Sequence, residues 1–190
     1  MKLIISILTL KVALAILSVP LALASPAPGA LMSLGTDTAS LYRSPLGFKI
    51  DSAETAWERI SPTKKSKFVI TQYRAKESYK NIFASLTLRR DSLKKKQSLE
   101  DYVEKWLGQY PKFGFDVIGS KRLKSKSKDS SRENEGFLID LVSRDGLKQL
   151  RQVVYVHDKN AFVLTCRDHK ENFKKSLKDC NKIIRSFEFE

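Results

Sequence analysis

Apolar and polar residues alternate along several stretches of the chain, with the period of two that is typical of half-buried β-strands. The pattern is clearest at 150–156 and 161–166, where Val, Leu, Tyr, Phe and Thr predominate. Turn-forming residues at 157–160 separate these two stretches, which predicts a hairpin. The remaining predicted strands span 46–51, 68–73, 82–89, 115–118 and 137–142.

Two stretches show instead the three-and-four spacing of an amphipathic helix. Ser98 and Asp101 form a helix-start box ahead of a predicted helix at 98–110, and half of the residues in its apolar stripe are aromatic. Asp168 and Glu171 form a second box, ahead of a stripe that consists of Phe173, Leu177, Cys180, Ile184 and Phe187. We expect both stripes to be buried in the core.

These elements follow one another as three strands, a helix, four strands and a final helix. Most neighbouring strands are joined by short turns, so we expect a largely antiparallel sheet with the two helices covering its apolar faces. Asp145-Gly146 suits a two-residue hairpin turn, so the strands around Phe137 and Leu150 are expected to pair. The predicted fold class is α+β.

The first 45 residues differ in composition from the rest. An apolar run at 12–19 follows Lys2 and Lys11, Pro20 breaks it, and Ala-Leu-Ala at 22–24 matches a signal-peptidase site. The run is well short of the roughly 20 residues that span a bilayer, so we expect a cleaved signal peptide at 1–24 rather than the alternative, an uncleaved membrane anchor.

The segment 25–45 is rich in Pro, Gly, Ala, Ser and Thr and is expected to be a flexible linker. A single domain then occupies 46–190. This organisation predicts an exported protein, periplasmic or secreted, with no transmembrane anchor after cleavage.

The domain resembles the PsbP/Mog1-like superfamily at fold-determining positions. The similarity extends over 46–187, and it is carried by LGFKID at 46–51 with Trp57, SLEDY at 98–102, AFVLTC at 161–166 running into Asn172-Phe173, and IIRSF at 183–187. It implies an α/β/α sandwich, with a central, mostly antiparallel sheet covered by two amphipathic helices. It also implies a non-catalytic binding or assembly module, as in photosystem accessory subunits, a nuclear-transport regulator and exported bacterial members.

Few residues point to catalysis. The two histidines, His157 and His169, fall in a predicted turn and at a predicted helix start, and we interpret both as ordinary polar residues. The sequence has no HExxH, CxxC or Gly-x-Ser-x-Gly motif and only eight glycines. We therefore expect no enzymatic activity, no metal site and no cofactor, with a dispersed Ser-His-Asp triad as an open alternative.

Cys166 and Cys180 allow two interpretations. Two cysteines in an oxidising compartment suggest a disulfide. If the last helix starts near Lys170, however, Cys180 lies on the order of 15 Å along it, whereas a disulfide needs Cα atoms within about 7 Å. This distance favours two small buried apolar residues and leaves the disulfide as the alternative.

Positive charge is the strongest indication of function. The chain has 35 Lys and Arg against 21 Asp and Glu, and loss of the leader lysines leaves 33 against 21, a net charge of +12. Basic clusters lie at 64–67, at 94–96 and in a polar segment at 121–132 that is expected to form a loop. The candidate contacts for an anionic partner are Lys121, Arg122, Lys124, Lys126, Lys128, Arg132, Lys94, Lys95 and Lys96.

These observations predict an exported, non-catalytic binding or assembly module that docks through a lysine-rich surface onto an acidic protein or an anionic envelope polymer or lipid. One alternative is that the lysine-rich segments only keep the protein soluble. Another is a nucleic-acid-binding protein, although the basic segments lack aromatic residues that stack on bases. A small hydrolase is the remaining alternative.

Overall fold

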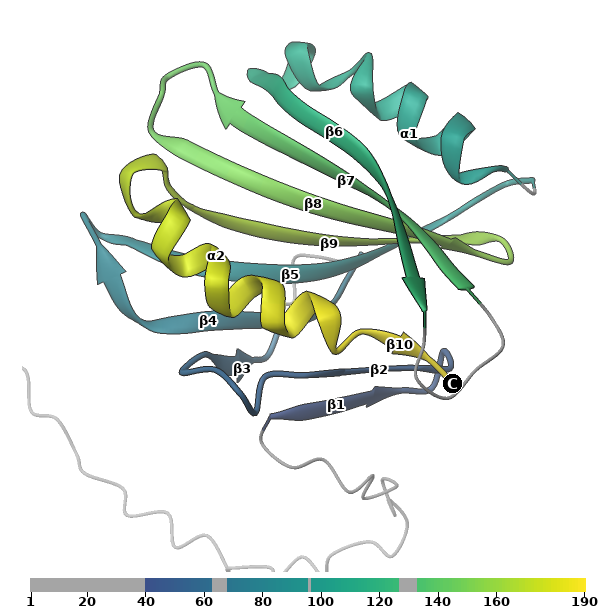
Figure 1. The fold of residues 1–190 in the computed structure, drawn as a ribbon, viewed down its shortest axis with the longest axis horizontal. Coiled ribbons are helices and arrows are strands. Elements are labelled where there is room, and N and C mark those ends of the chain that lie inside the picture. Colours follow the sequence, from purple (N-terminus) through teal and green to yellow (C-terminus); the bar gives the residue numbers. More distant parts are fainter. Residues whose placement is uncertain (1–39, 63–67, 96, 127–132) are drawn as a thin grey trace, which may run out of the picture. The chain divides into compact units, whose positions relative to one another are not determined.

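The computed structural model describes residues 40–62, 68–95, 97–126 and 133–190. Within these ranges the chain is mostly β, with ten strands in two antiparallel sheets, two α-helices and one short 3₁₀ helix (Figure 1). The predicted signal peptide, Lys96, Lys128 and Arg132 lie outside the described residues.

The larger sheet has the strand order β3-β4-β5-β9-β8-β7-β6, and neighbouring strands run antiparallel. Its strands are β3 (Glu58–Ile60), β4 (Val69–Tyr79), β5 (Ile82–Ser92), β6 (Phe115–Lys126), β7 (Glu133–Ser143), β8 (Lys148–His157) and β9 (Asn160–His169). The turn between β7 and β8 contains Gly146 at a φ of 72°, which glycine adopts without strain. The strands β3 and β6 form the two edges of this sheet.

The smaller sheet has three strands in the order β1-β2-β10. These are β1 (Leu41–Ser44), β2 (Phe48–Asp51) and β10 (Glu188–Phe189). Phe48 of β2 is fully buried, and its ring centroid lies 5.3 Å from that of Phe187. The ion pair between Lys49 and Glu188, at 3.1 Å, also joins β2 to β10. The strand β1 lies within the segment predicted as a linker.

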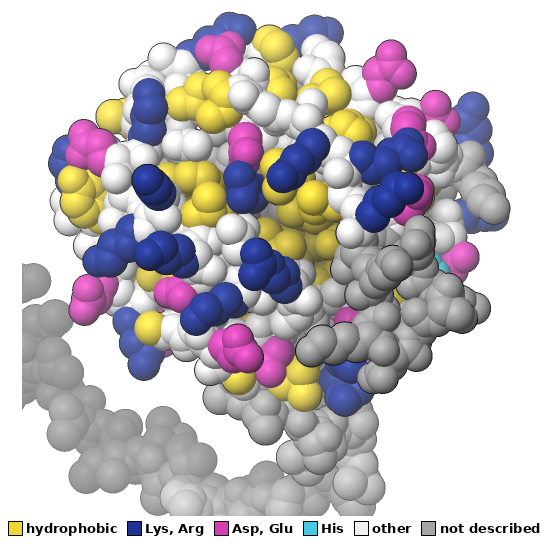
Figure 2. Space-filling model, viewed as in Figure 1, with side chains coloured by type: hydrophobic (Ala, Val, Ile, Leu, Met, Phe, Trp, Pro, Cys, Tyr) yellow, Lys and Arg dark blue, Asp and Glu magenta, His cyan; other side chains and the backbone are white. Residues whose placement is uncertain are grey.

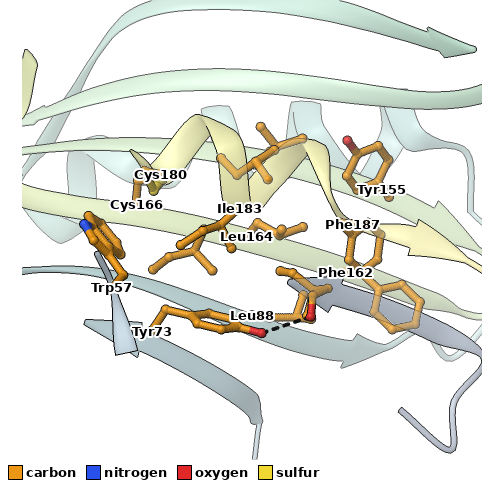
Figure 3. Close-up of a cluster of buried hydrophobic side chains, with 14 of the residues drawn as sticks. Trp57, Tyr73, Leu88, Tyr155, Phe162, Leu164, Cys166, Cys180, Ile183 and Phe187 are labelled. Carbon is orange, nitrogen blue, oxygen red and sulfur yellow. Dashed lines mark hydrogen bonds between the residues drawn. A yellow bond between two sulfur atoms is a disulfide. The ribbon is translucent and has the colours of Figure 1, made fainter. Parts of the chain in front are cut away.

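A hydrophobic core lies on each face of the seven-stranded sheet. We call one face the α2 side, because α2 (Lys170–Arg185) and the three-stranded sheet cover it. Figure 3 shows part of its core, including Leu88, Phe162, Leu164, Ile183 and Phe187. On the opposite face, the α1 side, α1 (Leu99–Leu107) packs over β7 and β8, next to η1 (Tyr110–Phe113). Adjacent residues of one strand alternate between the cores, as Val153 and Val154 do.

The predicted α/β/α sandwich, a sheet covered by two helices, is wrong. The chain is mostly β, and a second antiparallel sheet shares the α2 side with α2. The strands β1, β3 and β10 have four, three and two residues, which is too short to show a clear period. Residues 121–126, expected in a loop, form the second half of the edge strand β6, where exposure and charge hide the alternation.

Side chains cap both helix starts. Ser98 accepts a hydrogen bond of 3.0 Å from the backbone N–H of Asp101, and the Asp101 side chain reaches back to Ser98, which forms the predicted capping box. At α2 the cap is His169 rather than Asp168. Its Nδ1 accepts a 3.3 Å hydrogen bond from the N–H of Glu171, while the buried Asp168 accepts from Asn172 at 2.7 Å.

Cys166 and Cys180 form a disulfide, with Cα atoms 6.2 Å apart (Figure 3). The distance estimated from the sequence was wrong because it ignored the direction of the helix. Cys166 precedes the end of β9 by three residues, and α2 then folds back over the sheet. The chain moves away from Cys166 along β9 and then returns along α2, so Cys180 ends up close to Cys166. The disulfide fixes α2 to β9.

Candidate anionic-partner interface

The outer face of α2 is basic. Phe173, Cys180 and Ile183 face the core, and Leu177 packs beside them, whereas the basic residues of the helix are exposed. The exposed cations along the helix are Lys170, Lys174, Lys175, Lys178, Lys182 and Arg185. In the space-filling view, Lys and Arg side chains gather over α2 (Figure 2). We call these six residues the α2 row.

Most of the α2 row lacks a counter-charge. Lys182 lies 4.0 Å from Asp179 and donates a 2.9 Å hydrogen bond to the backbone oxygen of Glu54. The other five cations form no ion pair within the part of the chain that the structure describes. At 1.5 Å per residue, the α2 row is about 22 Å long.

The acidic residue in the first turn of α2 is engaged by another cation. The Glu171 carboxylate accepts hydrogen bonds from Lys80 Nζ at 2.7 Å and from the Tyr79 hydroxyl at 2.8 Å. The Lys80 bond is the main cause that lowers the pKa of Glu171, and the same bond raises the pKa of Lys80. Glu171 therefore stays ionised and bound to Lys80, and among the described residues it forms no ion pair with the lysines of the α2 row.

The predicted contacts on β6 are split between two faces of the sheet. Leu123 packs against the core on the α2 side, so by strand alternation Lys121 shares that side, whereas Arg122 and Lys124 share the α1 side. Arg122 is already paired with Glu100 of α1, and Lys124 lies opposite Glu135 in the β6–β7 register. The backbone of Lys126 ends the strand. Of Lys121, Arg122 and Lys124, only Arg122 forms an ion pair among the described residues, and the cluster is divided between two faces, whereas the α2 row lies along one helix.

Lys94 and Lys95 are exposed between β5 and the start of α1. The Arg122–Glu100 pair joins the middle of β6 to the first turn of α1, so these two lysines precede the same end of that helix. The structure thus groups Lys94 and Lys95 with Arg122 and Lys124 on the α1 side. It does not group them with Lys121.

Sequence reasoning missed the α2 row, although a signal was present. At 3.6 residues per turn, the side of the helix opposite the apolar stripe carries Lys174, Lys175, Lys178, Lys182 and Arg185, whereas Lys170, at the helix start, is in line with Leu177. The apolar stripe predicts the helix, but its basic residues are spaced along the chain and do not form a continuous run like Lys94 to Lys96. A helical projection of the charged residues would have found the α2 row.

Neither histidine forms part of a cluster with evident chemistry. His157 stacks on Phe189 with ring centroids 4.6 Å apart, and His169 caps α2. Among the described residues, no group of three or more His, Cys, Asp or Glu side chains is placed to hold a metal ion. A search of the same residues finds no helix with the length and hydropathy that a membrane span requires.

Comparison with known proteins identifies the fold. No family model matches the chain, and no curated protein matches it in sequence. The solution structure of PsbP from the cyanobacterium Synechocystis sp. PCC 6803 is similar, with a TM-score of 0.55 and 12% identity over 82% of this chain and 96% of that one. A Pseudomonas aeruginosa protein of unknown function, described as a putative regulator, has a TM-score of 0.51 and 18% identity over 75% and 93%. The chain therefore has a PsbP-like fold.

Proposed function

We propose that this protein is an exported, non-catalytic binding module that docks onto an acidic protein or an anionic envelope component through the α2 row. The observation that carries the proposal is the set of five exposed cations on α2 with no ion pair among the described residues. A rigid row about 22 Å long suits an extended anionic surface, because successive side chains can reach successive negative groups.

Two features support export. The leader predicted at 1–24 has the organisation of a signal peptide. The disulfide between Cys166 and Cys180 supports an oxidising compartment, because such bonds rarely persist in the cytosol. The likeness to cyanobacterial PsbP concerns the fold alone.

The expected affinity is modest. Near an anionic surface each basic side chain contributes about 1 kcal/mol, so five give roughly 5 kcal/mol. That energy corresponds to a dissociation constant of about 0.2 mM. Such binding weakens as salt screens the charges, and it becomes useful when many copies meet one surface or when further contacts add to it.

The test compares two triple charge reversals in the mature protein. One variant carries Lys174→Glu, Lys175→Glu and Lys178→Glu in the α2 row. The control carries Lys94→Glu, Lys121→Glu and Lys124→Glu, which changes the net charge equally at exposed positions elsewhere. Binding is measured by sedimentation with phosphatidylglycerol-containing vesicles, and by retention on immobilised polyglutamate, at about 50 mM and 500 mM salt.

We expect the α2 variant to lose retention on vesicles or polyglutamate at low salt, and the control variant to keep most of it. Equal loss in both variants would show attraction by net charge alone and would contradict the proposal. Unchanged binding by the α2 variant would contradict it as well. Single-stranded DNA at the same ionic strength forms a third arm. Binding to DNA that is at least about tenfold tighter than to the other two probes would favour the nucleic-acid alternative.

A further inference from the structure

The α1 side contains a cavity that the docking surface does not use. It has a volume of about 330 Å³ and lies where the end of α1, η1 and the strands β5 to β8 meet. Its lining residues are Arg89, Trp106, Tyr110, Phe113, Phe115, Leu141, Leu150 and Gln152. We call it the aromatic pocket. Its volume is at the lower end of the range for small-molecule sites and suits a ligand of about one ring.

Four of the residues that line the aromatic pocket are aromatic, namely Trp106, Tyr110, Phe113 and Phe115. The Trp106 ring lies 6.2 Å from the Tyr110 ring and 6.3 Å from the Phe113 ring, with 34° between the planes in both pairs. Gly114, at a φ of 79°, makes the sharp turn between η1 and β6 that brings Phe113 and Phe115 to the same cavity. Phe113 remains 61% exposed, which leaves a large aromatic surface at the rim without a covering residue.

The inner end of the aromatic pocket carries an unused hydrogen-bond donor. Gln152 is only 9% exposed, and its Oε1 accepts the hydrogen bond of the Tyr110 hydroxyl. Burial raises the pKa of Tyr110 to about 12, so this hydroxyl keeps its proton and remains the donor. The Gln152 amide N–H₂ has no hydrogen-bond partner among the described residues and is not one of their fully buried unpaired atoms, so it remains open to a ligand that takes the place of water.

Arg89 adds further donors, and its charge is balanced locally. Its guanidinium lies over the Trp106 ring at 5.3 Å, and its Nη2 donates to Asp91 Oδ2 at 3.1 Å. Asp91 also accepts the Tyr102 hydroxyl at 2.5 Å. The polar side chains that line the aromatic pocket are therefore Arg89, Gln152, whose Oε1 is already in use, and Tyr110, whose hydroxyl is in use, and its described lining residues include no carboxylate. A ligand that supplies an acceptor oxygen fits this set.

We propose that the aromatic pocket binds a small ring-shaped molecule that carries a carbonyl or carboxylate oxygen. The ring lies against Trp106 and Phe113, and the oxygen accepts from the Gln152 amide. A carboxylate gains further from Arg89 and from the positive charge of the protein. This site is separate from the α2 row, so its ligand need not be the docking partner.

The two tryptophans of the chain provide an internal control. Trp106 lines the aromatic pocket, whereas Trp57 belongs to the core on the α2 side and lines a separate recess whose residues are mostly polar. In a ¹H–¹⁵N spectrum each indole N–H gives its own signal. The mature protein is titrated with benzoate, acetophenone and toluene, which share a ring and differ in the acceptor. We expect benzoate and acetophenone to shift the Trp106 signal at concentrations about tenfold lower than toluene does, while the Trp57 signal stays in place.

Two variants test the geometry. Gln152→Glu keeps the acceptor for Tyr110 and the side-chain shape but removes the N–H₂ donor, so benzoate and acetophenone should weaken about tenfold and toluene should not. Phe113→Ala, at an exposed position, should weaken all three probes. Equal binding of toluene and acetophenone would overturn the proposal, as would unchanged binding in Gln152→Glu. A shift of Trp57 in place of Trp106, or no shift with any probe, would overturn it too.

Discussion

The two faces of the seven-stranded sheet share the same strands but are covered very differently. The α2 side has a helix of 16 residues, a disulfide and a second sheet over its core. The α1 side has a helix of nine residues and the short η1, and it leaves Phe113 exposed beside a cavity. The longer cover on the α2 side leaves two recesses beside α2, of about 450 and 430 Å³, whose lining residues are mostly polar, and an outer surface free to carry charge. Incomplete cover on the α1 side leaves a recess with aromatic walls.

The largest expected effect comes from the disulfide on the α2 side. Replacing both Cys166 and Cys180 by Ala should lower the free energy of unfolding by about 3 kcal/mol, because the bond closes a loop between residues 14 apart. Urea denaturation of the mature protein measures this change, and wild type under reducing conditions is the matched control. A double variant as stable as the oxidised wild type would show that the disulfide does not reinforce this side.

Two adjacent valines compare the faces directly. Val153 points into the core of the α2 side and Val154 into that of the α1 side, and each is 1% exposed. Substitution by Ala at either position should cost about 2 kcal/mol of unfolding free energy.

We expect the loss to be larger for Val153→Ala by about 1 kcal/mol, because the covering on the α2 side is held in place and cannot collapse into the void. On the α1 side, the short helix can shift towards the space that Val154→Ala leaves. Urea denaturation of the two variants side by side checks this. A larger loss for Val154→Ala would reverse the comparison.

Buried tyrosines should make the α1 side sensitive to alkaline pH. Burial raises the pKa of Tyr110 from 10.0 to about 12. A raised pKa in the folded protein adds stability below pH 10, and this stability is lost as the pH rises from 10 towards 12. By pH 11 the loss should be about 1.4 kcal/mol.

Unfolding free energies of wild type and Tyr110→Phe between pH 8 and pH 11 check this prediction. The variant lacks the ionisable group, so its stability should fall less steeply above pH 10. Tyr102 and Tyr155, whose pKa values burial also raises, remain in both proteins and cancel in the comparison. If the unfolding free energies of the two proteins fell equally steeply above pH 10, the raised pKa of Tyr110 would be contradicted.

The smallest expected effect on stability is that of the α2 row. Replacing Lys174, Lys175 and Lys178 by Glu should change the free energy of unfolding by less than about 0.5 kcal/mol, because these side chains are exposed and form no ion pair among the described residues. Thermal and urea denaturation measure the change. A loss above about 2 kcal/mol would mean that the lysines stabilise the fold and would remove the reason to assign them to binding.

The sequence predicted the elements that bury a regular face. The alternation at 150–156 and 161–166 and the apolar stripe from Phe173 to Phe187 correspond to β8, β9 and α2. Patterning could not predict β10, which has two residues and is held by Phe48, far away in the sequence. The charged half of β6 was predicted as a loop, because lysines on an edge strand look like solvated chain.

The candidate sites differ in how far the sequence could reveal them. The α2 row lies on one helix, so the spacing of its basic residues would have been enough to predict it, although the sequence analysis did not identify it. The aromatic pocket gathers Arg89, Trp106, Phe115 and Gln152 from four elements, and their meeting depends on the strand order of the sheet. Periodicity does identify the aromatic stripe of α1, but it assigns that stripe to the core. It cannot show that one end of the stripe remains open.

Chemical labelling of lysines tests most directly whether the α2 row is the docking surface. The mature protein is acetylated at low salt with and without phosphatidylglycerol-containing vesicles or polyglutamate, and the modification of each lysine is read by mass spectrometry. We predict that at least one of these surfaces protects Lys174, Lys175 and Lys178 several-fold, while Lys94, Lys121 and Lys124 react as they do in the free protein. Protection of the second set alone, or equal protection of both sets, would contradict the account.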